Sequence, residues 1–82
     1  MNMQDDDTTS RLRPIIAKVL KLPVGDIGSG TSRGTTAQWD SLSHMNLMLA
    51  LEEEFGVEFS DGEIADIASY AALAEALRRK QA

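Results

Sequence analysis

The feature that most constrains this sequence is the segment from Asp40 to Gly56, which has the pattern of one capped amphipathic helix. Asp40 is a favourable N-cap residue, and Gly56 suits the left-handed position that ends a helix. The apolar residues between them recur at helical spacing and do not alternate as in a strand. With 82 residues built around such a helix, the chain is expected to form one small domain with a single core.

This helix carries more apolar residues than one buried face needs. One set is spaced to pack against another helix: Leu47, Met48, Leu51 and Phe55. Leu42, Met45 and Leu49 fall on a neighbouring face, where they are available for the core or for a partner. For Met48 we favour a place in the core.

A second apolar stripe predicts an earlier helix. Its members share spacings of three and four residues: Leu12, Ile15, Ile16, Val19 and Leu20. We expect this helix to begin near Ser10 with Pro14 in its first turn, or to be kinked at Pro14. Residues 1–7 are expected to be a flexible tail, and residues 8–82 the single domain.

Two shorter helices are predicted after the central one. Ser60 and Glu63 form a capping box that opens a short helix, and Ser69 can cap a last one. The inward positions of the last helix are Tyr70, Leu73, Ala74 and Leu77. A glycine-rich loop spans residues 21–38, where Val24 and Ile27 are expected to pin it to the core. The expected fold class is all-α, a four-helix bundle with three major helices, one short third helix and a long first loop.

Charge is distributed unevenly along the chain, whose net charge is −5. Residues 40–77 hold nine acidic residues and no lysine or arginine. Such a surface repels nucleic acid and attracts basic protein patches, so we expect a protein partner and no nucleic acid. The sequence contains no cysteine and no apolar run of membrane-spanning length, and we expect a cytoplasmic monomer.

Asp40, Ser41 and His44 invite comparison with a catalytic triad. A triad needs an acid that orients the histidine and a histidine that reaches the serine hydroxyl. Here Asp40 lies at the helix cap and is not behind the imidazole, so we predict no catalytic residues. His44 is expected to be an ordinary exposed helix residue, and Trp39 a cover over the core. Ser41 is then a hydroxyl suited to modification by another enzyme.

Two ligand motifs fail on their spacing. A calcium loop beginning at Asp61 would place Ala65 and Ala72 at ligand positions, so no metal site is predicted. The segment Gly28-Ser29-Gly30 lacks the lysine and hydroxyl residue of a phosphate loop.

A resemblance to the acyl carrier protein family lies in residues 39–60, WDSLSHMNLMLALEEEFGVEFS. The Asp-Ser-Leu signature is followed by an apolar helix that ends in Glu-Glu-Glu-Phe, and the order of the other expected helices agrees. The resemblance implies that Ser41 is the attachment point of 4′-phosphopantetheine. It further implies that a phosphopantetheinyl transferase moves the group from coenzyme A, assisted by Asp40, and that the protein is a carrier and not an enzyme.

The resemblance also implies partners with basic docking patches: an acyl ligase or acyltransferase, a ketosynthase and other acyl-processing enzymes. The residues expected to contact them are Leu42, Met45, Asn46, Leu49, Glu52 and Glu53. Fatty-acid carriers tend to have acidic residues where this chain has Ser43 and Asn46. A specialised, polyketide-like pathway is therefore favoured over primary fatty-acid synthesis. The alternatives are a peptidyl or aminoacyl carrier, and an unmodified helical adaptor.

Overall fold

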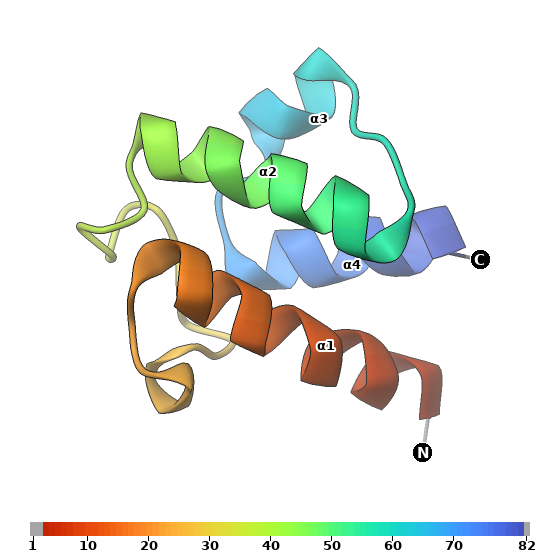
Figure 1. Ribbon diagram of the computed structural model, residues 1–82, viewed down its shortest axis with the longest axis horizontal. Coiled ribbons are helices and arrows are strands. Elements are labelled where there is room, and N and C mark those ends of the chain that lie inside the picture. Colours follow the sequence, from red (N-terminus) through yellow and green to blue (C-terminus); the bar gives the residue numbers. More distant parts are fainter. Residues whose placement is uncertain (1–2, 82) are drawn as a thin grey trace.

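Three long helices bury their apolar faces against one another in the computed structural model (Figure 1). The structure describes the backbone of residues 3–81 and the side chains of residues 8–81. Its elements are α1 (Met3–Leu20), the 3-10 turn η1 (Val24–Asp26), α2 (Ser41–Phe55), α3 (Asp61–Asp66) and α4 (Tyr70–Gln81). The predicted all-α bundle, with a short third helix and a long first loop, is confirmed.

Helix α1 begins earlier than the sequence pattern indicates. It starts at Met3 and continues through Pro14, so the predicted start near Ser10 is wrong. A tertiary contact near this end is made by Thr8, which is buried and donates its hydroxyl to Gln81 Oε1 at 3.2 Å. Pro14 removes one backbone donor inside the helix. The flexibility of residues 1–7 stays a prediction, and residues 1–2 lie outside the described part of the chain.

The core is formed by the predicted faces. The residues with at most 2% exposure are Leu12, Ile16, Leu20, Ile27, Trp39, Leu47, Met48, Leu51, Leu73 and Leu77. Ile15, Val19 and Phe55 are half-buried at its edge. The assignment of Met48 to the core and of Trp39 to its cover is therefore confirmed.

The long loop between α1 and α2 is fastened at two places. Ile27 inserts into the core as predicted, whereas Val24 is 48% exposed, so its predicted anchoring role is wrong. Val24 opens the η1 turn, and this turn buries none of its three residues. Farther along, Tyr70 N–H donates to Thr31 O and Arg33 N–H donates to Ala68 O, both at 2.9 Å. The loop is thereby held against the connection between α3 and α4.

The predicted helix ends are confirmed in detail. Gly56 has φ of 66° at the end of α2. Ser60 and Glu63 exchange both hydrogen bonds of the capping box at the start of α3. Ser69 Oγ accepts from Ala72 N–H in the first turn of α4. Each motif depends only on residues within four positions, which is why the sequence was sufficient to find it.

Candidate functional site

The first turn of α2 presents Ser41 to solvent. Asp40 is the N-cap, and its carboxylate accepts from Ser43 N–H at 2.8 Å. This hydrogen bond is the main reason why the pKa of the Asp40 carboxyl lies below its ordinary value. Ser41 follows as the first helical residue, is exposed, and its hydroxyl forms no hydrogen bond with any described residue. The structure thus displays a free hydroxyl at the positive end of a helix.

Behind Ser41, the buried face of α2 is locked by a histidine. Trp39 Nε1–H donates to His44 Nδ1 at 2.9 Å, and His44 Nε2 lies 2.7 Å from Ile64 O in α3. Because the indole can only donate, Nδ1 accepts, and the ring proton is on Nε2, which donates to the carbonyl. Trp39 is 2% exposed and His44 3% exposed.

The predicted exposed position of His44 is therefore wrong. Its burial depends on Trp39 and on Ile64, which is 20 residues farther along the chain, and helical spacing alone carries no signal of that second partner. Both ring nitrogens are used in these hydrogen bonds, so His44 is not placed to take a proton from Ser41. The residue instead connects the segment before α2 to α3.

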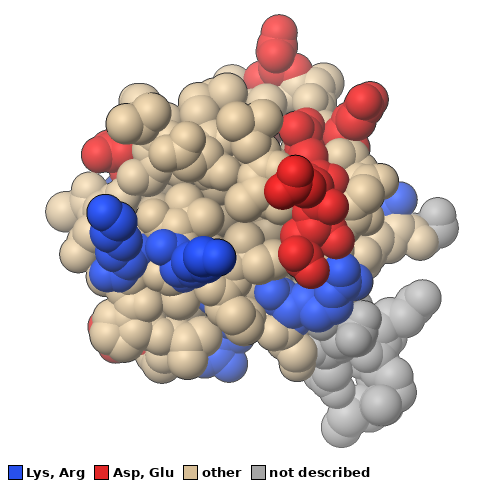
Figure 2. All heavy atoms as spheres, viewed as in Figure 1, with Lys and Arg blue, Asp and Glu red and all other residues tan. Residues whose placement is uncertain are grey.

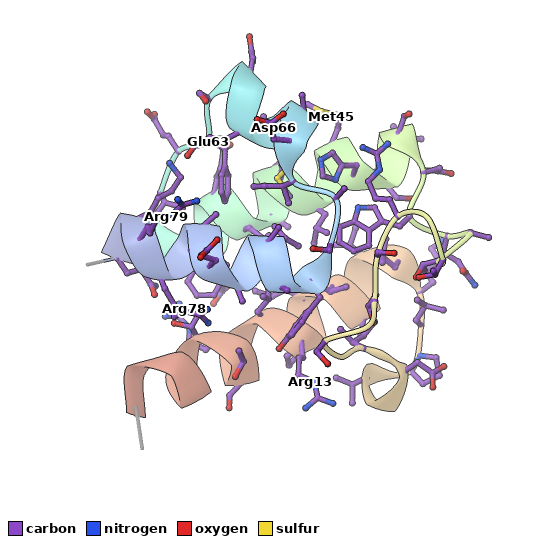
Figure 3. The ribbon with its side chains drawn as sticks, turned by 180° about the vertical axis from the view of Figure 1, so that it is seen from behind. Arg13, Met45, Glu63, Asp66, Arg78 and Arg79 are labelled. Carbon is purple, nitrogen blue, oxygen red and sulfur yellow. The ribbon has the colours of Figure 1, made fainter. Side chains whose placement is uncertain are left out.

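An open groove of about 350 Å³ lies beside Ser41, between α2 and α3. It is lined by Arg33, Ser41, His44, Met45, Asp61, Ile64 and Ala65. Figure 3 labels Met45 at this end of the molecule, near α3. Arg33 is the residue here that sequence reasoning missed, because the hydrogen bond from Arg33 N–H to Ala68 O brings two distant segments together.

The outward face of α2 carries the other predicted residues. Leu42 is 73% exposed, Leu49 59% and Met45 45%. Asn46 and Glu53 are also exposed. These five residues, which we call the outer face of α2, form an apolar surface with a polar border on a single helix. Their exposure is shown, whereas their contact with a partner stays a prediction.

Glu52 differs from the other predicted partner residues. It is half-buried, and its carboxylate accepts from Phe59 N–H at 2.8 Å. This hydrogen bond satisfies a backbone donor in the connection between α2 and α3. Glu52 therefore has a structural task in the isolated chain, in addition to any role at a surface.

The acidic surface is partly neutralised by residues from outside the acidic segment. Figure 2 shows acidic side chains gathered over the C-terminal half of α2, with basic side chains directly beside them. Arg11 reaches Glu54 at 4.0 Å and lies 4.3 Å from the centre of the Phe55 ring. Lys80 lies 2.9 Å from Glu63. Part of the negative charge of residues 40–77 is thus compensated by basic side chains in the folded protein.

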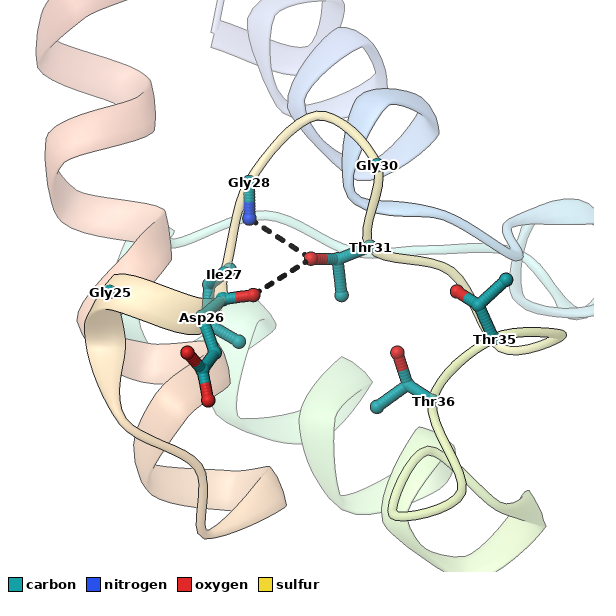
Figure 4. Close-up of a pocket in the computed structure, with 8 residues that line it drawn as sticks. All are labelled: Gly25, Asp26, Ile27, Gly28, Gly30, Thr31, Thr35 and Thr36. Atoms are coloured by element: carbon teal, nitrogen blue, oxygen red, sulfur yellow. Dashed lines mark hydrogen bonds between the residues drawn. The ribbon is translucent and has the colours of Figure 1, made fainter.

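A second hollow of about 360 Å³ lies in the long loop (Figure 4). Its lining includes Gly28 and Gly30, from the segment that lacks the lysine and hydroxyl residue of a phosphate loop. The Gly28 N–H donates to Thr31 Oγ1 at 2.9 Å, and Thr31 Oγ1 in turn donates to Asp26 O at 3.3 Å. One backbone amide of this segment is therefore already used within the loop and is not available to a phosphate.

Within the described residues, no group of three or more histidine, aspartate and glutamate side chains is placed to hold a metal ion. Among the helices that the structure describes, none combines the length and the apolar character needed to cross a membrane.

Comparison with known protein families gives one match that spans most of the chain. The family model described as "Phosphopantetheine attachment site" matches residues 10–77. The matched region begins within α1, ends within α4 and contains Ser41, the groove and the outer face of α2.

Proposed function

This chain belongs to the phosphopantetheine-attachment family, and we propose that it is an acyl carrier protein whose Ser41 bears the group. Members of this family hold 4′-phosphopantetheine covalently and are generally carriers and not catalysts. The observation that carries the assignment to Ser41 is its exposed, unbonded hydroxyl at the N-terminus of α2, within the matched region.

The residues around Ser41 fit such a group. A phosphodiester at a helix N-terminus is favoured by the helix dipole by about 0.3–1 kcal/mol. The groove beside Ser41 offers room for the first atoms of an arm, between α2 and α3. When bound, the group supplies a thiol, which this chain lacks because it contains no cysteine.

The chain's own residues have limited roles in the loading reaction. The Ser41 oxygen forms a bond to phosphorus, its proton leaves, and the bond to the adenosine bisphosphate part of coenzyme A breaks. The base for this step is supplied by the transferase, since His44 is committed to Trp39 and Ile64. Asp40 holds the first turn of α2 through Ser43 N–H, and its exposed carboxylate is available to the transferase and its metal ion.

The outer face of α2 supports the proposed contacts with acyl-processing enzymes. Leu42, Met45 and Leu49 offer apolar area that the core does not use, and Glu53 adds a charge at the border. Charged borders speed association and keep it sensitive to salt, which suits brief encounters with several enzymes. Ser43 and Asn46 make the start of this surface less acidic, which favours a specialised, polyketide-like pathway. The proposed location is the cytoplasm.

The experiment that tests the carrier role is intact-mass measurement after incubation with coenzyme A and a broad-specificity phosphopantetheinyl transferase. We expect a gain of one phosphopantetheine in the wild-type chain and none in Ser41→Ala. Ser43→Ala is the matched control, because it removes a hydroxyl from the same helical turn and should load normally. An unchanged wild-type mass with several transferases would favour the unmodified adaptor.

The cargo requires a separate experiment with the loaded protein. We expect fatty acyl or polyketide-type ligases to form a thioester on it, and amino acid ligases to leave it unchanged. The reverse result would support a peptidyl or aminoacyl carrier.

The proposed docking surface is tested by the rate at which one such ligase charges the loaded protein. Leu49→Ala should raise the KM for the carrier, because it removes exposed apolar area from the outer face of α2. Glu75→Gln, at an exposed position of α4, is the control and should leave the KM unchanged. Equal KM values for all three proteins would place the docking surface elsewhere.

A further inference from the structure

Arg33 is a half-buried cation close to Ser41. Its side chain lines the groove that also contains Ser41, and its guanidinium forms no hydrogen bond or ion pair with any described residue. Its charge is felt at Asp40, where it helps to keep the pKa of the carboxyl low, although the hydrogen bond from Ser43 is the larger cause.

Other basic residues of the fold are differently placed. Arg11 has Glu54 and the Phe55 ring, and Lys80 has Glu63. The N–H donors of a guanidinium stay available to a ligand where no protein group accepts from them. The position of Arg33 is therefore informative, because the fold keeps a donor-rich group next to Ser41 without using it.

Backbone contacts hold Arg33 in place at the groove. Arg33 N–H donates to Ala68 O at 2.9 Å, and Ser32 pairs with Ser69 in an isolated β-bridge. Only the side chain then has to be ordered when an anion arrives, so little backbone entropy is lost.

Loading of Ser41 would add negative charge beside acidic residues, and Arg33 is placed to compensate that charge. A phosphodiester adds one negative charge close to Asp40, in a groove that Asp61 also lines. Residues 40–77 contain no lysine or arginine, and Arg33 is the cation among the residues that line this groove. A guanidinium offers paired donors that match phosphate oxygens.

We propose that the groove contains a binding site for a singly charged phosphate ester on Ser41, with the Arg33 guanidinium as its ligand. The inference rests on the proposed function and goes beyond it, because it assigns the chain a non-covalent hold on the group. The arm is then steered toward α3 at its first atoms, while its far end stays free to reach partner enzymes.

The test is a thermodynamic cycle that compares the melting temperatures (Tm) of unloaded and loaded protein, for the wild-type chain and for Arg33→Gln. At low salt, loading should change Tm more favourably in the wild-type chain than in the variant, by about 2–4 °C. The difference should shrink in about 1 M salt, because an exposed ion pair is screened. Comparing loaded with unloaded protein cancels the effect of the substitution on the fold itself.

Arg13→Gln is the matched control, since it removes the same charge from an exposed arginine whose guanidinium contacts Val24 O. Figure 3 shows Arg13 on the opposite side of the molecule from Met45. Loading should change the Tm of this control as it does in the wild-type chain. Equal loading effects in all three proteins overturn the inference. If loading of Arg33→Gln is also slow in that case, Arg33 serves the transferase instead.

A second measurement needs no variant. The Arg33 Nε–Hε resonance in the wild-type spectrum should shift when Ser41 is loaded, whereas the Arg13 resonance should not. An unmoved Arg33 signal on a chain of increased mass overturns this inference alone. Failure of the chain to gain mass overturns the proposed function, and this inference with it.

Discussion

The two faces of α2 are built from similar residues and have opposite environments. Leu47 and Leu51 on the inner face are fully buried, whereas Leu42 and Leu49 on the outer face are 73% and 59% exposed. Both faces lie on one helix of 15 residues. The inner face sets where the helix sits, whereas Leu42 and Leu49 on the outer face lie mostly in solvent.

This difference separates two tasks along the same sequence. Inner-face residues can change only at a cost in stability, because cores are close-packed. Under the proposed docking role, outer-face residues are free to change with the partner. Ser41 lies at the end where both faces begin, so its position depends on the inner face, and its proposed encounters with other enzymes depend on the outer one.

The largest expected effect comes from a matched pair of leucine truncations. Leu51→Ala should lower the free energy of unfolding by about 2–5 kcal/mol, because it removes buried atoms and leaves a cavity. Leu49→Ala should change it by less than about 0.5 kcal/mol, because the side chain is mostly in water. Urea unfolding followed by circular dichroism measures both. Similar losses for the two variants would break the distinction between the faces.

A smaller effect is expected at the histidine of the inner face. His44→Ala should cost about 1–3 kcal/mol, because it leaves the Trp39 N–H and the Ile64 carbonyl without their partner. His44→Gln should recover part of the loss, since its amide can both accept and donate. Urea unfolding again provides the measurement. If His44→Ala is as stable as the wild-type chain, the two hydrogen bonds add nothing to the stability of the inner face.

The pH dependence of stability tests the ends of α2 and α3. The pKa values of Asp40 and Glu63 lie below their ordinary values of 3.8 and 4.5, chiefly because of hydrogen bonds from Ser43 N–H and Ser60 N–H respectively. Their contribution is therefore present above those ordinary values and is lost as the pH falls through the lowered ones. We expect Tm to fall below about pH 4.5, in part through these two groups.

Asp40→Asn isolates this titration, because asparagine is an equally good N-cap that carries no charge. The wild-type chain should melt above the variant at pH 6, and the gap should close toward pH 3. A gap that is independent of pH would mean that the charge on Asp40 does not contribute.

The smallest expected effect concerns repulsion within the acidic segment, residues 40–77. Added salt or millimolar magnesium should raise the Tm, because it screens repulsion among the acidic residues between Asp40 and Glu75. The rise should be larger in Arg11→Gln, which removes the guanidinium near Glu54. A flat or falling Tm in both proteins would show that the acids are already compensated within the fold.

Local motifs account for what the sequence could predict. The Asp40 cap, the Ser60–Glu63 box and Gly56 at the end of α2 each depend on near neighbours, and all are present. Ser41 was selected on the same kind of local signature, and its role as the attachment residue stays a proposal. The all-α fold followed from helical spacing together with these ends.

What the sequence could not predict depends on distant partners. The burial of His44 requires Ile64, and the position of Arg33 requires Ala68. The early start of α1 coincides with a contact between Thr8 and Gln81, 73 residues apart. Tertiary contacts of this kind override local preference, and no spacing rule within one helix contains them.

The hydrogen bond between Trp39 and His44 also has a consequence for the fluorescence of this protein. Trp39 is the single tryptophan of the chain, it is buried, and it lies two residues before Ser41. Tryptophan emission from the whole protein therefore originates beside the proposed modification site. A group that enters the groove and disturbs His44 would change the surroundings of that one indole, so loading and unloading should be observable in the unlabelled protein by fluorescence.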